Sequence, residues 1–388
     1  MENTTDSSQQ SASQSDAPVV IVTGASAGVG RAIAAAFAQH GFRVALLARG
    51  QAGLDGARED VEHLGGEPFV IMTDVANPCQ VDAAARHVVG RWGRIDVWVN
   101  AAMATVVGPV DAISADEFKR VTEVAYLGYV YGTLAALRHM RPRGAGRIIQ
   151  IGSALAYRAI PLQSAYCGAK FAIRGFTDSL RTELIHDRSA IRLTMVQLPG
   201  VNTPQFDWSR MHFAHRHQPI GACYEPEAVA QAVVEVALST HPPRELWLGW
   251  PTLQAIAGAM AAPGFADRYL ARNSYDQQIS DDPVLPGDPD VLFAPASEDH
   301  GARGRFTAKA KNDLIAVDPF HLRSGALFAG LGLLAGAFLL GRSSGGAQAR
   351  GLRRPWQRSA KTRASSSSTA ASNILPGAPS RVTPSRRR

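Results

Sequence analysis

Short apolar runs alternate with amphipathic stretches along the chain from residue 18 onward. The runs are rich in valine, isoleucine and leucine, and the stretches between them repeat their apolar residues at helical spacing. This alternation predicts an α/β fold in which helices cover both faces of a doubly wound, seven-stranded parallel sheet. The predicted strands are residues 19–23, 43–48, 68–72, 95–100, 147–152, 191–197 and 245–249.

Three of the predicted helices have recognisable beginnings. One apolar stretch, residues 29–40, directly follows the glycine-rich turn after the first strand. Another begins after Ser114, where the four residues up to Glu117 have the pattern of a capping box. A third helix is expected from Tyr166 toward Glu183.

The regular pattern fades after residue 261. Residues 281–297 are crowded with proline, aspartate and glycine, which predicts an exposed connector. The first 16 residues are polar and lack an apolar stretch, so we expect disorder there and no signal peptide. The predicted organisation is a disordered N-terminus (1–16), a main domain (17–260), an irregular extension and linker (261–323), one apolar helix (324–342) and a basic disordered tail (343–388).

An uncharged apolar run, residues 325–341, lies between Arg323 and Arg342. As a helix its seventeen residues would reach about 26 Å, slightly less than the roughly 30 Å hydrocarbon core of a bilayer. We expect a membrane helix over residues 324–342, with a buried or oligomer-forming helix as the alternative. A short interfacial helix with both flanks in the cytoplasm is equally compatible with the sequence.

The net charge of +7 comes from the C-terminal tail. Residues 342–388 contain ten arginines, one lysine and no acidic residue, so the rest of the chain is net negative. We expect the tail to hold anionic lipid headgroups, and nucleic-acid binding is a weaker alternative. The sequence contains three scattered cysteines, Cys79, Cys167 and Cys223. They lack the spacing of a disulfide framework or a metal knuckle, so they fit a reduced, cytoplasmic compartment.

Glycines follow the first predicted strand and lead into the next helix. Gly24, Gly28 and Gly30, with Ser26 and Val29 between them, allow a tight turn and a close approach of the backbone. The free N–H groups of the helix N-terminus could then bind a pyrophosphate. A glycine-rich turn without a ligand is the alternative, but the position at the start of a βαβ pattern favours a dinucleotide site.

The second and third predicted strands end near charged residues. In a dinucleotide-binding fold, an acid at the end of the second strand binds the adenosine ribose, whereas a cation there favours a 2′-phosphate. Arg49 occupies this position, so the sequence favours NADP(H) over NAD(H), unless Arg49 is an ordinary exposed strand-end residue. Asp74 follows the third strand and could pair with the adenine edge or form a turn.

Three side chains could carry acid/base chemistry. Tyr166 and Lys170 are four residues apart at the start of a predicted helix, so they share one face. A cation near a phenol lowers the pKa of the phenol toward the range of an acid/base catalyst. Ser153 follows the strand predicted at 147–152, at the sheet edge where ligands bind, and its hydroxyl could hydrogen-bond a substrate carbonyl. Their combination with the predicted phosphate site points to catalysis.

Together these motifs resemble the classical short-chain dehydrogenases/reductases over roughly residues 18–249. The resemblance is carried, in the family's order and spacing, by Gly24, Gly28, Gly30, Asp74, Asn100-Ala101-Ala102, Ser153, Tyr166, Lys170, Pro199-Gly200 and Thr203. It implies a Rossmann-type dinucleotide-binding catalytic domain over 17–260 that interconverts a ketone or aldehyde and an alcohol with NADP(H). It also implies a homo-oligomer.

The resemblance implies a role for each matched residue. Tyr166 would be the acid in reduction and the base in oxidation, Lys170 would lower its pKa and hold the nicotinamide ribose, and Ser153 would orient the substrate oxygen. The other matched residues would bind the cofactor: Gly24, Ser26, Gly28 and Val29 at the pyrophosphate, Asp74 at the adenine, Asn100 near the ribose and Thr203 at the nicotinamide carboxamide.

The sequence departs from the family pattern in two segments. The stretch after the fourth strand reads Asn100-Ala101-Ala102-Met103, where the family usually has Asn-Asn-Ala-Gly. Ala125 stands where the family often has an Asn that anchors a water of the proton relay. The alternative to an active oxidoreductase is therefore a catalytically weak NADP-binding scaffold at the membrane.

The segment from Pro199 to Glu225 would cover the active site in such a fold. Its large apolar side chains are Phe206, Trp208, Met211, Phe213 and Tyr224. They predict a lipophilic substrate. The segment also contains His212, His215 and His217. No acid or cysteine stands near these histidines at ligand spacing, so we expect a solvated loop and no metal site.

Overall fold

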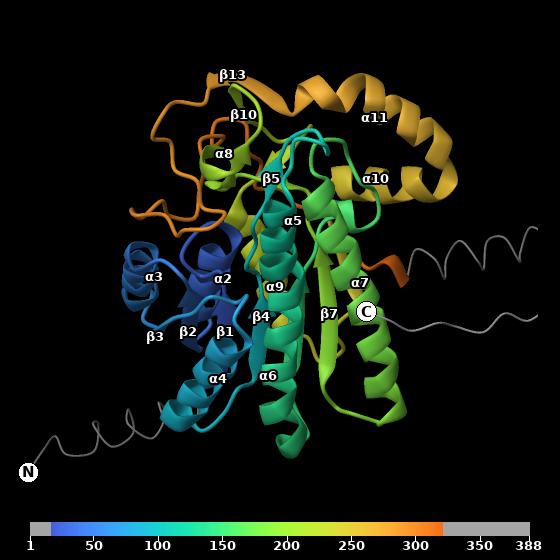
Figure 1. Cartoon of the computed structure of the whole chain (residues 1–388). Coiled ribbons are helices and arrows are strands. Elements are labelled where there is room, and N and C mark those ends of the chain that lie inside the picture. Colours follow the sequence, from blue (N-terminus) through green and yellow to red (C-terminus); the bar gives the residue numbers. More distant parts are fainter. Residues whose placement is uncertain (1–16, 321–388) are drawn as a thin grey trace, which may run out of the picture. The chain divides into compact units, whose positions relative to one another are not determined.

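A twisted sheet forms the centre of the protein, in the strand order β14-β12-β7-β6-β4-β1-β2-β3 (Figure 1). The computed structural model describes residues 17–320. The strands of this sheet are β1 Val19–Thr23, β2 Arg43–Ala48, β3 Glu67–Met72, β4 Val97–Asn100, β6 Arg147–Ile151, β7 Arg192–Gln197, β12 Glu245–Leu248 and β14 Ala316–Val317. The seven predicted strands are confirmed as the parallel part of the sheet. The edge strand β14, which pairs antiparallel with β12, was not predicted.

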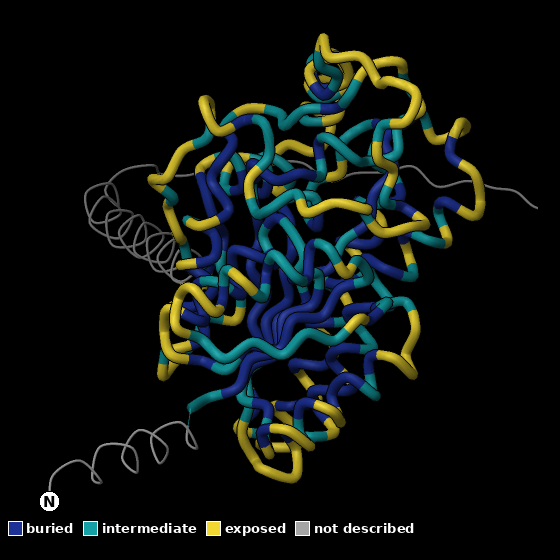
Figure 2. Tube along the Cα trace, turned by 90° about the vertical axis from the view of Figure 1, so that its left-hand side faces the viewer, coloured by how far each residue is buried: buried dark blue, intermediate teal, exposed yellow. Residues whose placement is uncertain are grey.

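Helices cover both faces of the sheet. One face carries α2 Gly28–Gln39, α3 Gln51–His63 and α9 Pro226–Leu238. The other carries α4 Pro78–Trp92, α6 Gly128–Arg143 and α7 Ser164–His186. The strands lie between two hydrophobic cores, as the buried centre of the trace in Figure 2 shows. Strand β1 is buried at all five positions, which explains its uninterrupted apolar sequence.

The strand order places a crevice at the middle of the sheet. Strand β1 pairs with β2 on one side and with β4 on the other. The chain therefore adds strands first on one side of β1 and then on the other, which makes this the switch point of the sheet. In open α/β sheets, ligands bind outside the carboxyl ends of the strands at this point. The glycine-rich turn after β1 and the residues after β4 and β6 therefore meet at one edge.

The helix α5 Ala115–Thr122 leads into α6 through a turn of π-helix, η1 Glu123–Leu127. The predicted capping box is present: Ser114 N–H donates to the carboxylate of Glu117 at 2.7 Å, and Glu117 N–H donates back to the Ser114 hydroxyl at 3.3 Å. π-Helical turns inside α-helices occur often at functional sites. Here the π-helical turn contains Ala125, where the family resemblance leads us to expect an Asn that anchors a water of the proton relay.

The C-terminal extension is folded, contrary to the expectation of an irregular segment. It follows α10 Trp250–Ala261 and contains α11 Pro263–Gln277 and β13 Ile279–Pro283, which pairs with β10 His215–His217. These elements gather with α8 Gln205–Trp208 at one end of the sheet (Figure 1). Helix α11 escaped prediction because almost all of its side chains are solvent-exposed, so its sequence carries no apolar stripe.

Smaller elements complete the folded part. They are β5 Val106–Val107, paired with β9 Arg210–Met211; β8 Gly200–Val201, paired with β11 Cys223–Tyr224; and the 3-10 turn η2 Ala154–Ala156. The predicted N-terminal segment 1–16, the predicted membrane helix 324–342 and the basic tail 343–388 lie outside the described residues. Within residues 17–320, no helix is both long and apolar enough to cross a bilayer.

Candidate active site

A single cleft of about 220 Å³ runs along the carboxyl ends of the central strands. Arg49 and Asp74 line one end, and Ser153, Tyr166 and Lys170 line the other. The glycine-rich turn lies between them through Gly24, Ser26, Gly28, Val29 and Gly30. The fold therefore brings the predicted cofactor residues and the predicted catalytic residues into one continuous site, with Asn100 as the exception.

The turn after β1 requires glycine at two positions. Gly24 has φ +71°, and a Cβ there would lie 2.7 Å from Cα of Ala102. A Cβ on Gly30 would lie 2.2 Å from the carbonyl oxygen of Gly24. Because any side chain would collide with backbone, the turn must stay open, and the N-terminus of α2 faces the cleft. This geometry fits a pyrophosphate.

Ser153 is held at the end of β6 by its backbone as well as by its side chain. Its N–H donates to Oε1 of Gln197 at 2.7 Å, and its Oγ accepts from Leu155 N–H at 3.1 Å. Ser153 and Tyr166 line the same end of the cleft, and the Ser153 hydroxyl acts to lower the pKa of Tyr166. The structure thus brings the two side chains to one crevice.

Tyr166 and Lys170 lie on adjacent turns of α7, with Nζ of Lys170 5.4 Å from the centre of the Tyr166 ring. Burial lowers the pKa of Lys170 to about 7. Burial also raises the pKa of Tyr166 above its usual value, although the hydrogen bond from Ser153 acts in the opposite direction. In the free protein, desolvation thus outweighs the lowering of the Tyr166 pKa that the sequence predicted from Lys170.

Tyr129 is a site residue that the sequence reasoning missed. Its hydroxyl accepts a hydrogen bond from Nζ of Lys170 at 3.2 Å and donates to the carbonyl of Ile151 at 3.0 Å. Lys170 donates to the same carbonyl at 2.8 Å. A signal was present in the sequence, because Tyr129 follows Ala125 by four residues and so lies on the same helical face.

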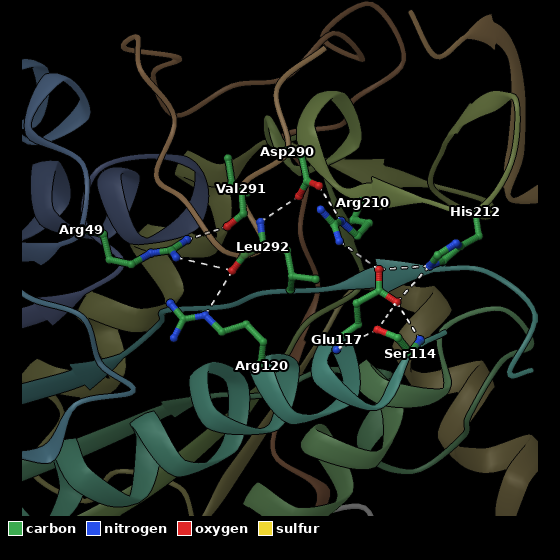
Figure 3. Close-up of polar contacts among 9 residues, drawn as sticks. All are labelled: Arg49, Ser114, Glu117, Arg120, Arg210, His212, Asp290, Val291 and Leu292. Carbon is green, nitrogen blue, oxygen red and sulfur yellow. Dashed lines mark hydrogen bonds and ion pairs between the residues drawn. The ribbon is translucent and has the colours of Figure 1, made fainter. Parts of the chain in front are cut away.

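Arg49 does not face an open phosphate site. The sequence predicted that this side chain binds a 2′-phosphate, but in the structure its guanidinium is already hydrogen-bonded within the chain. Its guanidinium donates to the carbonyls of Val291 at 2.6 Å and Phe293 at 3.2 Å. Arg120 donates to the carbonyl of Leu292 at 3.2 Å, beside Arg49 (Figure 3). Part of the segment predicted as an exposed connector is thus hydrogen-bonded to Arg49, the residue predicted to bind the 2′-phosphate. Burial and the neighbouring Arg120 lower the pKa of Arg49.

Asp74 and Thr203 line the cleft as predicted. One carboxylate oxygen of Asp74 accepts from the N–H of Ala76 at 3.0 Å, which is the turn-forming role left open from the sequence. The other oxygen pairs with Arg120 at 2.8 Å. Thr203 lies beside the glycine turn, since a Cβ on Gly28 would meet its side chain at 3.2 Å.

Asn100 does not line the cleft, so its predicted place near the ribose is not met. Its side chain is fully buried behind the cleft wall. The amide oxygen accepts from Trp98 Nε1 at 2.8 Å, and the amide nitrogen donates to Gln150 at 2.9 Å and to Thr133 at 3.2 Å. These bonds join β4, β6 and α6, which is a structural role.

The aromatic segment after β7 is packed largely against the protein itself. Phe206 is buried against Phe306, with ring centres 5.3 Å apart, and Trp208 alone of the five predicted apolar residues lines the cleft. His212 contacts the carboxylate of Glu117 at 3.1 Å. His217 is 3% exposed, so the prediction of a wholly solvated loop is wrong for this residue.

Comparison with known proteins gives the family. Residues 18–211 match the family profile described as short chain dehydrogenase. The chain is 31% identical over 283 residues to the uncharacterized oxidoreductase YxnA of Bacillus subtilis, and the match covers 71% of this chain and 77% of that protein. The chain belongs to the short-chain dehydrogenase family. As a short-chain dehydrogenase/reductase, it is an oxidoreductase.

Two further relatives indicate the range of this family. The short-chain dehydrogenase is 33% identical over 192 residues to 3-dehydrosphinganine reductase of Danio rerio, covering 48% of this chain and 57% of that protein. Among solved structures it resembles an alcohol dehydrogenase from Thermococcus sibiricus complexed with 5-hydroxy-NADP, with 28% identity and a TM-score of 0.53. That likeness covers 60% of this chain and 96% of the archaeal chain.

Proposed function

We propose that this short-chain dehydrogenase interconverts a carbonyl compound and an alcohol with NADP(H). The observation that carries the proposal is that Ser153, Tyr166 and Lys170 line one end of a cleft that the glycine turn also lines, with Lys170 one turn from Tyr166 on α7. A nicotinamide cofactor, when bound, would supply or accept the hydride. The chain supplies the acid/base groups.

The side chains divide the remaining chemistry between them. In reduction, the Tyr166 hydroxyl donates its proton to the carbonyl oxygen of the substrate as that oxygen gains negative charge. The Ser153 hydroxyl hydrogen-bonds the same oxygen and fixes its position. In its charged form Nζ of Lys170 has three protons, and two protein acceptors leave one N–H to hold the cofactor. In oxidation, Tyr166 takes the proton back.

Arg49 supports a preference for NADP(H). Within residues 17–320 it has no carboxylate partner, and its guanidinium bonds only neutral carbonyls. A 2′-phosphate would be a stronger, charge-assisted acceptor for the same group. The archaeal relative was solved with an NADP derivative, which agrees with this choice.

An apolar carbonyl compound is the substrate class that the lining supports. Met103, Ala104, Leu198 and Trp208 line the cleft together with the catalytic residues. Apolar walls with a few polar groups are typical of sites for apolar small molecules. The relative named 3-dehydrosphinganine reductase carries the name of a lipid substrate, which fits the same class.

A panel of apolar ketones and aldehydes, tested with NADPH and NADH side by side, examines the proposal. We expect NADPH oxidation with apolar members of the panel and a kcat/KM at least tenfold lower with NADH. Arg49→Ala should remove this preference, whereas Arg58→Ala, a change of the same type on the exposed face of α3, should keep it. Tight NADPH binding without any turnover would instead indicate a scaffold.

Membrane association and a homo-oligomer belong to the same proposal and rest on the sequence alone. The apolar run 325–341 and the basic tail support binding to anionic membranes. Membrane association is tested by co-sedimentation with anionic and neutral vesicles, compared between the whole chain and a chain ending at residue 323. The homo-oligomer is tested by light scattering of the purified protein.

A further inference from the structure

The adenosine end of the cleft is already bonded to another part of the same chain. Gly28 N–H, at the start of α2, donates to the carbonyl of Gly301 at 3.1 Å. A Cβ on Gly50 would lie 3.2 Å from Cβ of Pro295. Arg49 bonds three successive carbonyls of the same segment, residues 291–293. We name residues 290–301 the strap.

The strap is anchored at both ends. Near its start, the carboxylate of Asp290 accepts from Nε of Arg210 at 2.5 Å, and Arg210 continues to Glu117 at 3.2 Å (Figure 3). Near its end, Asp299 pairs with Arg31 of α2. Between these anchors the strap contributes Val291, Leu292, Pro295, Ala296, Glu298 and His300 to the lining of the cleft.

Leu292 is inserted between the two anchors. It is 1% exposed and belongs to the same hydrophobic cluster as Val75 and Val124, which also line the cleft. Its neighbours in the strap are mostly exposed. Burial of this one leucine therefore adds an apolar contact to the polar contacts that hold the strap.

The charges at this end are arranged for an anion. The guanidinium groups of Arg49 and Arg120 converge on the carbonyl oxygen of Leu292, at 3.5 and 3.2 Å (Figure 3). Asp74 pairs with Arg120, whereas Arg49 forms no ion pair among the described residues. A phosphate dianion would bind Arg49 more strongly than the neutral carbonyls do.

The size of the cleft agrees with partial occupation by the strap. Small-molecule sites usually enclose roughly 300–1,000 Å³. The cleft encloses about 220 Å³ with the strap in place. The strap residues form part of the lining that bounds this volume.

We propose that the strap is an internal competitor of the cofactor, which binds Arg49 and Gly28 in the free protein and is displaced when a 2′-phosphorylated adenosine binds. The proposal rests on the proposed function. The strap then partly sets the affinity of the protein for the cofactor. The 2′-phosphate replaces the strap carbonyls as the partner of Arg49. The cofactor affinity of the protein should then rise when the strap is loosened.

Loosening the strap tests the proposal by binding alone. Leu292→Ala removes the buried side chain and should tighten NADPH and NADH binding, each by roughly tenfold. Asp290→Asn weakens the anchor at Arg210 without touching the cleft and should act in the same direction. Leu285→Ala, a matched change at an exposed leucine outside the strap, should leave both dissociation constants unchanged. Unchanged or weaker binding by Leu292→Ala and Asp290→Asn would overturn the proposal.

Amide hydrogen exchange gives an independent readout on the full chain. Adenosine 2′,5′-bisphosphate should speed exchange across residues 290–301, whereas adenosine 5′-monophosphate at the same concentration should not. Slower exchange in the strap with the bisphosphate would mean that the strap is a roof of the bound cofactor and would refute displacement. If neither NADPH nor NADH binds the wild type or the loosened variants, the proposed function fails as well.

Discussion

The hydroxyl oxygen of Tyr129 lies 3.2 Å from Nζ of Lys170. Both groups donate to the carbonyl of Ile151, and both are buried. The family resemblance leads one to expect a water at this side of the lysine, anchored by the Asn that Ala125 replaces. Tyr129, one helical turn further on, occupies a hydrogen-bonding position on Lys170 instead. It is therefore a positioning residue for Lys170.

Tyr129→Phe should lower kcat with little change in KM. The variant keeps the ring but removes an acceptor that favours the charged amine, and a hydrogen bond to a charged group contributes about 1.5–3 kcal/mol. The pKa of Lys170 should fall by roughly one unit, and the pH–rate profile should move to lower pH. Tyr131→Phe, on the same helix, serves as the control. Superimposable pH profiles for wild type and Tyr129→Phe would mean that Tyr129 only supports packing.

The pH dependence of reduction should report Lys170. Burial lowers the pKa of this amine to about 7, so it is charged below that pH and neutral above it. Tyr166 stays protonated over the same range because burial raises its pKa. We therefore expect kcat/KM for carbonyl reduction to fall as pH rises through about 7. In Lys170→Met the activity should be lower at every pH, and the fall in kcat/KM near pH 7 should disappear. A fall that persists in this variant would mean that another group titrates there.

Asn100→Ala should destabilise the fold more than it impairs the chemistry. The change leaves the buried donor of Trp98 and the polar side chains of Gln150 and Thr133 with fewer partners. A buried polar group without its partner costs about 1–3 kcal/mol. Chemical denaturation should show a loss of at least this size. A variant of unchanged stability with weakened cofactor binding would restore the ribose role expected from the sequence.

The strands and the catalytic group were predictable because their signals are local. Strand β1 is an unbroken run of β-branched residues, and a strand buried on both faces needs such a run. Ser153 and the helix of Tyr166 come together because the carboxyl ends of parallel strands share one edge of the sheet. No tertiary contact had to be known in advance.

The strap and Tyr129 were not predictable in the same way. The carbonyl of Val291 lies 242 positions from Arg49 in sequence, and no local pattern announces such a contact. The prolines and aspartates around Leu292 correctly indicate exposure but hide the one side chain that is buried. The spacing of four residues from Ala125 is a local hint for Tyr129, but its contacts with Ile151 and Lys170 arise only from the packing of α6 on the sheet.

The measurement that tests the account most directly is turnover by Tyr166→Phe with NADPH and the best carbonyl substrate of the panel, alongside NADPH binding by fluorescence quenching. General acid catalysis contributes about 100- to 10,000-fold. We predict a loss of turnover of this size with NADPH binding largely intact. Turnover equal to that of the wild type would contradict the assignment of Tyr166 as the acid.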